Sequence, residues 1–251
     1  MVFAVTMQAQ KKTHFDSTNQ KFKNGQIVWH VVSDGDTVGQ FWPVNGINIV
    51  TTDTDPQFFE ENISLESIQR NLRGIATAPD GMTSASIGAQ MEGKCLSHGK
   101  PCGDGFIYDY GIIVVSPNGF HIDFTHKREF KNFDSSYNQY QKIGASLFFL
   151  PSVYRNGSFI LSEKLLEKVF IKRDTPNGEQ IGVIIFDNLI TYNQAREIVL
   201  GLDRKGKSKT THIYMLDGGS TYGQACKEIN GQYITIGTRQ PQVNSNYLVF
   251  Y

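Results

Sequence analysis

Ile181-Gly182-Val183-Ile184-Ile185-Phe186 is a continuous apolar run that is followed by Asp187. A second such run, His212-Ile213-Tyr214-Met215-Leu216, is followed by Asp217. Continuous apolar runs of this length are typical of strands buried on both faces. Between them, Thr191-Tyr192-Asn193-Gln194 has the form of a capping box, and Ala195, Ile198, Val199 and Leu202 follow at helical spacing. The stretch therefore predicts a strand, a helix that starts at Thr191 and ends in the polar segment 203–209, and a second strand.

The order strand, helix, strand predicts a right-handed crossover whose two strands are parallel. Parallel strands end at the same edge of a sheet, and ligands of α/β sheets usually bind at that edge. Asp187 and Asp217 each follow one of the two strands. We therefore expect these carboxylates to lie together at a site.

Turn signals indicate that much of the remaining chain forms antiparallel hairpins. Six Asn-Gly dipeptides, which favour the positive-φ turns of hairpins, occur at 24–25, 45–46, 118–119, 156–157, 177–178 and 230–231. The clearest hairpin joins 111–115 to 120–124, whose second arm alternates apolar and polar residues, and a further pair is 233–236 with 247–250.

Helical patterns are few. One starts at Ser64, with Leu65, Ile68 and Leu72 on one face, and a short one covers Glu163 to Val169. Together with the hairpins they predict an α+β or mixed α/β fold. We expect a strand-rich single domain with a mixed β-sheet, several Asn-Gly hairpins and a C-terminal βαβ unit that carries the site.

Composition limits the classes of partner. The chain has 251 residues, and its 24 Lys and Arg balance its 24 Asp and Glu to a net charge of zero. A nucleic-acid-binding protein needs a basic excess to displace counterions from phosphates, so we expect no nucleic-acid partner. No stretch approaches the roughly 18 to 20 apolar residues of a membrane helix, so we expect no membrane span. The oligomeric state is left open.

The N-terminus and the cysteines bear on localisation. Residues 1–12 form an apolar run that ends in Lys11-Lys12. They resemble the back half of a secretion signal, and a disordered or frayed N-terminus is the alternative. We expect a secreted or periplasmic protein, in which Cys95 and Cys102 pair and Cys226 stays free. Inert thiols are the alternative, and both outrank a zinc site, because only His98 joins these cysteines locally.

The segment that follows the second strand carries the strongest functional signal. In Asp217-Gly218-Gly219-Ser220-Thr221 a carboxylate leads from a strand into a glycine-rich loop. Successive backbone N–H groups in such a loop bind anions, and carboxylate plus loop suits an ester, phosphate or sugar substrate. A tight turn in which Asp217 caps its own backbone is the alternative.

In context, Met215 to Thr221 resembles the Leu-Asp-Gly-Gly signature of the phosphodiester glycosidase family. Further stretches are similar to that family in the same order: Asp80-Gly81-Met82 with 87–94, then 151–157, Arg173 to Val183, and Ile185-Phe186-Asp187. The chain departs from the family at Asp80, where Asn is usual, and at Phe148-Phe149-Leu150, where Gln-Ser-Gly is usual. The resemblance implies one domain of this type over 13–251 and a hydrolase that cleaves a sugar from a phosphodiester.

The resemblance also implies roles for site residues. Asp217 would act as base or nucleophile, Asp187 would position a hydroxyl or water, and Asp80 would be a third carboxylate. Arg173, helped by Lys172, would hold the phosphate in a charge-assisted fork. The loop residues would add N–H and hydroxyl donors: Gly218, Gly219, Ser220 and Thr221.

Each assignment has a structural alternative. Lys172 and Arg173 would be solvated charges, and Asp187 and Asp80 would cap strand ends. The chemistry needs no cofactor. A metal at His121, Asp123 and His126 is less expected than a solvated hairpin face. The rival function is a catalytically inactive glycan-binding or cell-envelope structural protein on the same fold, which the lost polar residues favour. A third possible function is that of a different phosphodiesterase that uses the same loop.

Overall fold

The computed structural model describes residues 12–22, 25–44, 47–51, 85–88, 92–101, 110–116, 119–124, 133–159, 163–203, 207–216, 225–236 and 246–250. The N-terminal half contains β1 (Thr13–Lys21), β2 (Ile27–Ser33), β3 (Asp36–Pro43), β4 (Ile47–Thr51), β5 (Ala85–Gly88), β6 (Glu92–Ser97), β7 (Lys100–Pro101), β8 (Tyr110–Ser116) and β9 (Gly119–Phe124). The C-terminal half contains α2 (Phe133–Lys142), β10 (Ser146–Arg155), β11 (Ser158–Phe159), β12 (Leu165–Thr175), β13 (Gly178–Thr191), α3 (Tyr192–Gly201), β14 (Lys209–Met215), β15 (Ala225–Ile229), β16 (Gln232–Ile236) and β17 (Asn246–Phe250).

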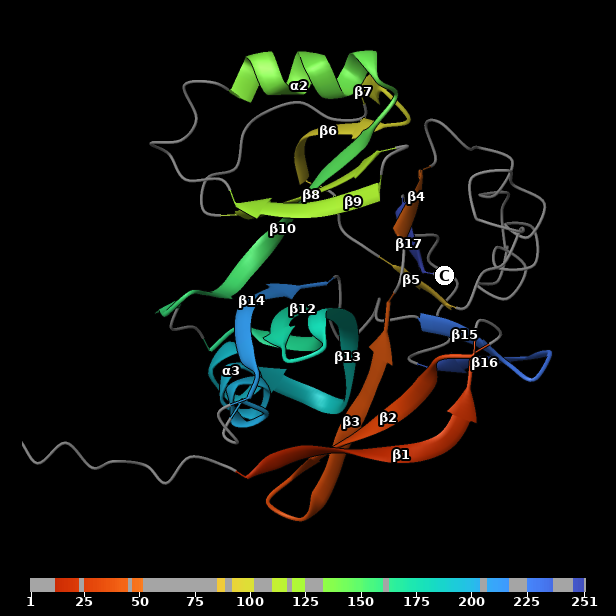
Figure 1. Cartoon of the computed structure of the whole chain (residues 1–251), viewed down its shortest axis with the longest axis vertical. Coiled ribbons are helices and arrows are strands. Elements are labelled where there is room, and N and C mark those ends of the chain that lie inside the picture. The colour runs from red at the N-terminus through yellow and green to blue at the C-terminus, as the bar shows by residue number, and fades with distance from the viewer. Residues whose placement is uncertain are drawn as a thin grey trace, which may run out of the picture.

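These strands form two sheets (Figure 1). The larger sheet holds twelve of the described strands in the order β1-β2-β3-β13-β12-β14-β10-β6-β7, with β8, β9 and β11 attached through β10. The smaller sheet has the order β16-β15-β5-β17-β4. An isolated bridge between Phe22 and Ile229 joins the end of β1 to β15. Within the described ranges, no helix is long and apolar enough to cross a membrane.

The α+β or mixed α/β prediction was wrong, because the described chain is built from strands that pair antiparallel. β13 and β14 do lie in one sheet and run in the same direction, but β12 lies between them and pairs antiparallel with both. The helix α3 thus connects two strands of one sheet that run in the same direction, as predicted, but these strands are not neighbours in the sheet. The cause is β12, whose apolar residues 169–171 fill the central position of the sheet.

The turn signals were reliable where the structure describes them. Asn156 and Gly157 close the β10–β11 hairpin with φ values of 42° and 94°, and Asn230 and Gly231 close the β15–β16 hairpin with 51° and 80°. The predicted hairpin of β8 and β9 forms with Gly111 opposite Phe124. β16 and β17 also form as predicted, but β15 and β5 separate them in the sheet.

The helix predictions had mixed outcomes. The helix α3 starts as predicted: Thr191 accepts a hydrogen bond from the Gln194 N–H, and the Gln194 side chain accepts one from the Thr191 N–H. The apolar positions Ala195, Ile198 and Val199 are buried. A helix over Glu163 to Val169 was wrong, because the segment is in β12 from Leu165 onward. The helix predicted from Ser64 lies outside the described residues.

The two faces of the larger sheet carry separate apolar clusters. On one face α3 packs with Tyr192, Ala195, Ile198 and Val199 against Phe41, Val169, Ile171, Ile184 and Ile213. We call this the helix face. On the other face Trp42, Phe170, Val183 and Tyr214 pack with Phe22 and with Ile229 of the smaller sheet. We call this the inter-sheet face.

Candidate functional site

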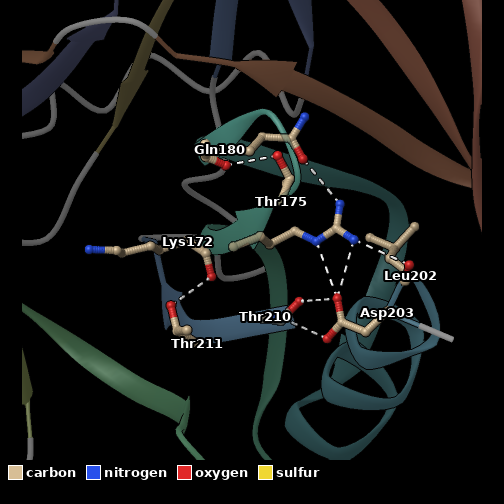
Figure 2. Close-up of polar contacts among 9 residues, drawn as sticks. Lys172, Thr175, Gln180, Leu202, Asp203, Thr210 and Thr211 are labelled. Carbon is tan, nitrogen blue, oxygen red and sulfur yellow. Dashed lines mark hydrogen bonds and ion pairs between the residues drawn. The ribbon is translucent and has the colours of Figure 1, made fainter. Parts of the chain in front are cut away.

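Arg173 and Lys172, predicted as a phosphate-binding pair, point to opposite faces of the sheet. Arg173 is 5% exposed and lies on the helix face. Its guanidinium donates to Asp203 Oδ1 from Nε at 3.4 Å and from Nη2 at 3.2 Å, to Gln180 Oε1 at 3.1 Å and to the Leu202 carbonyl at 3.2 Å. Asp203 also accepts hydrogen bonds from the Thr210 N–H and hydroxyl (Figure 2). Arg173 thus ties the end of α3 to the start of β14.

Lys172 extends away from this network, as Figure 2 shows. Its Nζ lies 2.6 Å from Glu179 Oε2 on the neighbouring strand, and its side chain is 20% exposed. Its carbonyl accepts a hydrogen bond from the Thr211 hydroxyl. The structure therefore does not bring the two predicted cations together, because adjacent residues of a strand face opposite ways.

Asp187 lies within β13 and not after it. The β12–β13 register passes from Leu166 opposite Ile190 to Lys168 opposite Ile185, so that residues 186–189 of β13 face Glu167 alone. Such an irregularity re-aims side chains and interrupts pairing. Asp187, Asn188 and Leu189 are exposed there. The carboxylate is accessible at the predicted edge of the sheet, and the strand continues beyond it to Thr191.

Two charged residues at this irregularity were missed by the sequence analysis. Lys168 is fully buried, and its carbonyl accepts a hydrogen bond from the N–H of Leu216, the residue before Asp217. Burial raises the pKa of the adjacent Glu167, and the charge of Lys168 opposes that rise. The available signal was the charged pair Glu167-Lys168 inside the otherwise apolar segment 165–171, because a buried ammonium is costly unless it is compensated.

The remaining predicted site residues lie outside the described part of the chain. They are Asp80, Asp217, Gly218, Gly219, Ser220 and Thr221. The described structure reaches Leu216 and resumes at Ala225. What it places at this edge is the exposed Asp187, the half-buried Glu167 and the buried Lys168.

His212 was also missed. It pairs across the strands with Lys172 of β12 and Arg155 of β10. Burial and, after it, the charges of Lys172 and Arg155 lower the pKa of His212 to about 4, against the opposite effect of Asp174 and Glu179. His212 is therefore neutral at pH 7. Nothing in the sequence around His212 signalled this, because the three residues come from three separate strands.

Lys227 is the fourth residue that the sequence analysis missed. It lies on β15, is 1% exposed and donates from Nζ to Gln40 Oε1 at 2.6 Å and to Gln20 Oε1 at 3.1 Å. The ammonium also lies 5.3 Å from the centre of the Trp42 ring. Burial lowers its pKa to about 8. These contacts join β1 and β3 of the larger sheet to the smaller sheet.

Metal-binding groups are absent from the part of the chain that is described: no three His, Cys, Asp or Glu side chains there gather as ligands. The side chains of His121 and Asp123, and residue His126, lie outside it. Cys95 is disulfide-bonded, while Cys102 lies outside the described residues and so does the side chain of Cys226. Cys95 is therefore not an inert thiol.

Comparison with known proteins gives a likeness of fold. No family model matches the chain, and no curated protein matches it. A hypothetical protein from Synechocystis is 11% identical, with a TM-score of 0.47 over 96% of this chain and 68% of that one. The catalytic domain of zebrafish N-acetylglucosamine-1-phosphodiester alpha-N-acetylglucosaminidase, auto-inhibited by its pro-peptide, is 12% identical, with a TM-score of 0.56 over 98% of this chain and 85% of that one. The chain is thus similar in fold to the catalytic domain of a glycosidase.

Proposed function

We propose that the chain is a hydrolase that cleaves a sugar from a phosphodiester-linked glycan. The observation that carries this proposal is the fold likeness to the zebrafish phosphodiester glycosidase, which extends over 98% of the chain. The Asp217-Gly218-Gly219 motif supports it, because in the sequence it begins two residues after the end of β14 at Met215. We propose one domain over 13–251 and a carbohydrate or sugar-phosphate substrate.

The chemistry assigns Asp217 as base or nucleophile. A departing phosphate monoester is already a good leaving group, so little proton donation is needed and one well-placed carboxylate can suffice. Asp187 would position a hydroxyl or water, and Asp80 would be a third carboxylate. The role of Asp187 is supported by its exposure in the irregular part of β13, which lies near the end of β14 in the sheet.

Phosphate binding is assigned to the loop in preference to Arg173. The guanidinium of Arg173 makes four hydrogen bonds with protein acceptors on the helix face, which fix it in place. The N–H groups of Gly218 and Gly219 and the hydroxyls of Ser220 and Thr221 are the proposed donors, because successive N–H groups of a glycine-rich loop suit an anion.

A secreted or periplasmic location completes the proposal. The disulfide at Cys95 supports it, since disulfides persist mainly in oxidising compartments. In the β6–β7 hairpin Leu96 lies opposite Pro101. In the sequence Cys95 comes directly before Leu96 and Cys102 directly after Pro101, which supports Cys102 as the disulfide partner of Cys95.

The decisive experiment measures release of free sugar from a panel of sugar 1-phosphodiesters. We expect Asp217→Asn to lower turnover at least ~10²-fold, the range for loss of a positioned proton-transfer group, with little change in stability. Asp36→Asn is the matched control, because Asp36 is an exposed carboxylate at the start of β3. Its turnover should equal that of the unmodified protein.

Two results would overturn the proposal. Turnover that survives in Asp217→Asn, together with a fall in stability of about 1 kcal/mol, would make Asp217 a turn cap. Absence of hydrolysis by the unmodified protein on every phosphodiester, together with saturable sugar binding, would favour the inactive glycan-binding protein.

A further inference from the structure

Three basic side chains stand side by side on the inter-sheet face of the larger sheet. Lys172 on β12 is opposite His212 on β14, and His212 is opposite Arg155 on β10. Neighbouring strands are about 4.8 Å apart, so the imidazole lies between two long cationic side chains. We call these three residues the basic row.

The basic row is separate from the residues to which the proposed function assigns a role. His212 is four residues before Leu216, which follows β14, a distance of about 13 Å along an extended backbone. The row contains none of the residues to which the proposed function assigns a role. An inference about the row accordingly goes beyond the proposed function.

All three side chains of the basic row are half-buried. Partial burial strengthens their interactions relative to fully solvated charges, and it still leaves them within reach of a ligand. Like charges on opposed strands destabilise a sheet unless a negative charge offsets them. In the structure the Glu179 carboxylate, which is 46% exposed, offsets the charge of Lys172. An exposed carboxylate of this kind is free to move aside for a ligand.

The hydrogen bonds of His212 define its tautomer. The Thr211 hydroxyl donates to the Lys172 carbonyl at 3.2 Å, so its oxygen is left to accept from His212 Nδ1 at 3.0 Å. The neutral imidazole then carries its proton on Nδ1, and Nε2 holds a lone pair. An oxyanion that contacts Nε2 requires a proton there. Binding and proton uptake are therefore coupled at this residue.

We propose that Lys172, His212 and Arg155 form a binding site for a phosphoryl or sulfuryl oxyanion, which is taken up together with a proton on His212 Nε2. The charged groups that act on His212 are Lys172, Arg155, Asp174 and Glu179, and the cations outweigh the carboxylates. The ring of Tyr214, 5.6 Å from that of His212, is the neutral neighbour on the same strand. A doubly charged oxyanion matches two fixed cations and one imidazolium.

The test measures the affinity of the full chain for inorganic phosphate, inorganic sulfate and a sugar phosphate monoester. Each titration is done at pH 5.5 and at pH 7.5. Sodium chloride at matched ionic strength is the control for screening by salt. We expect saturable binding of all three anions. Sulfate, which is doubly charged at both pH values, should bind about tenfold or more tighter at pH 5.5, whereas a phosphate monoester itself takes up a proton near pH 6. The ring signals of His212, followed by NMR, should titrate at a higher pH when oxyanion is present. Tighter binding of the sugar phosphate than of free phosphate would identify a phosphorylated ligand, and equal binding would identify the free ion.

Variants distinguish binding at the basic row from a general effect of the positive charge of the protein. Lys172→Met and His212→Gln should each weaken binding about tenfold or more, and His212→Gln should also abolish the pH dependence of sulfate binding. Lys142→Met, an exposed lysine of α2, should bind as the unmodified protein does. Binding that is absent, that matches the effect of chloride or that is unchanged in both row variants would overturn the proposal. The NMR titration of the unmodified protein decides the matter even if a variant fails to fold.

Discussion

The two faces of the larger sheet each bury a cation, and they compensate its charge differently. On the helix face, Arg173 meets the carboxylate of Asp203 and two further oxygen acceptors. On the inter-sheet face, Lys227 meets the neutral carbonyl oxygens of Gln20 and Gln40. The Asp203 carboxylate balances the charge of Arg173, whereas burial among neutral amide oxygens lowers the pKa of Lys227 to about 8. The comparison teaches that a buried cation paired with a carboxylate acts as a structural anchor, whereas a buried amine held only by neutral oxygens responds to pH.

The largest expected effect comes from removing the carboxylate on the helix face. Asp203→Ala leaves Arg173 buried without its counter-charge and removes the acceptor of the Thr210 N–H. We expect the free energy of unfolding, measured by urea denaturation, to fall by about 3 to 5 kcal/mol. Asp174→Ala, at an exposed neighbouring carboxylate, is the control and should change stability by no more than about 0.5 kcal/mol.

A double variant sharpens this test. Arg173→Met combined with Asp203→Ala removes both charges, so it should be less destabilised than the sum of the two single variants. If the two losses simply add, the pair is not coupled and the contrast between the faces fails.

The next effect is the pH dependence caused by Lys227. Its pKa is about 8 in the folded chain, below the ordinary 10.5. Between these values the unfolded chain keeps a proton that the folded chain has released, so the free energy of unfolding should rise with pH. The expected rise is on the order of 3 kcal/mol from pH 8 to 10.5, relative to Lys227→Met at each pH.

Lys142→Met serves as the control for Lys227, since it removes an exposed amine and should leave the pH dependence of the protein unchanged. Parallel stability curves for the unmodified protein and Lys227→Met would contradict the assignment. Lys227 would then behave as a compensated cation, like Arg173, and the two faces would not differ.

The smallest effect tests whether the helix face depends on the start of α3. Thr191→Ala removes the hydroxyl that accepts from the Gln194 N–H and should cost about 1 kcal/mol in the free energy of unfolding. Thr191→Ser keeps that hydroxyl and should lose only a few tenths of a kcal/mol by the same measurement. A serine variant as unstable as the alanine variant would assign the loss to the methyl group and not to the cap.

Features that depend on nearby residues were predicted well. The α3 start, the Asn-Gly turns at 156–157 and 230–231, and the β8–β9 hairpin all follow from contacts within a few residues. The predicted helix over 163–169 failed because β-strand pairing with β13 and β14 outweighed a short apolar periodicity. Of the candidate site, Asp187 lies inside β13, whereas the sequence analysis placed it after the strand.

The sequence alone therefore determined the turns, the helix start and two of the buried strands, β13 and β14, because those depend on local backbone preferences and on apolar patterning. Only the tertiary structure decided that β12 lies between β13 and β14, and that Lys172 and Arg173 serve opposite faces. It also decided which cations are buried and with what partners: Lys227 meets side chains 187 and 207 residues away in the sequence. Strand order and charge compensation are set by contacts between distant segments, and no local pattern encodes such contacts.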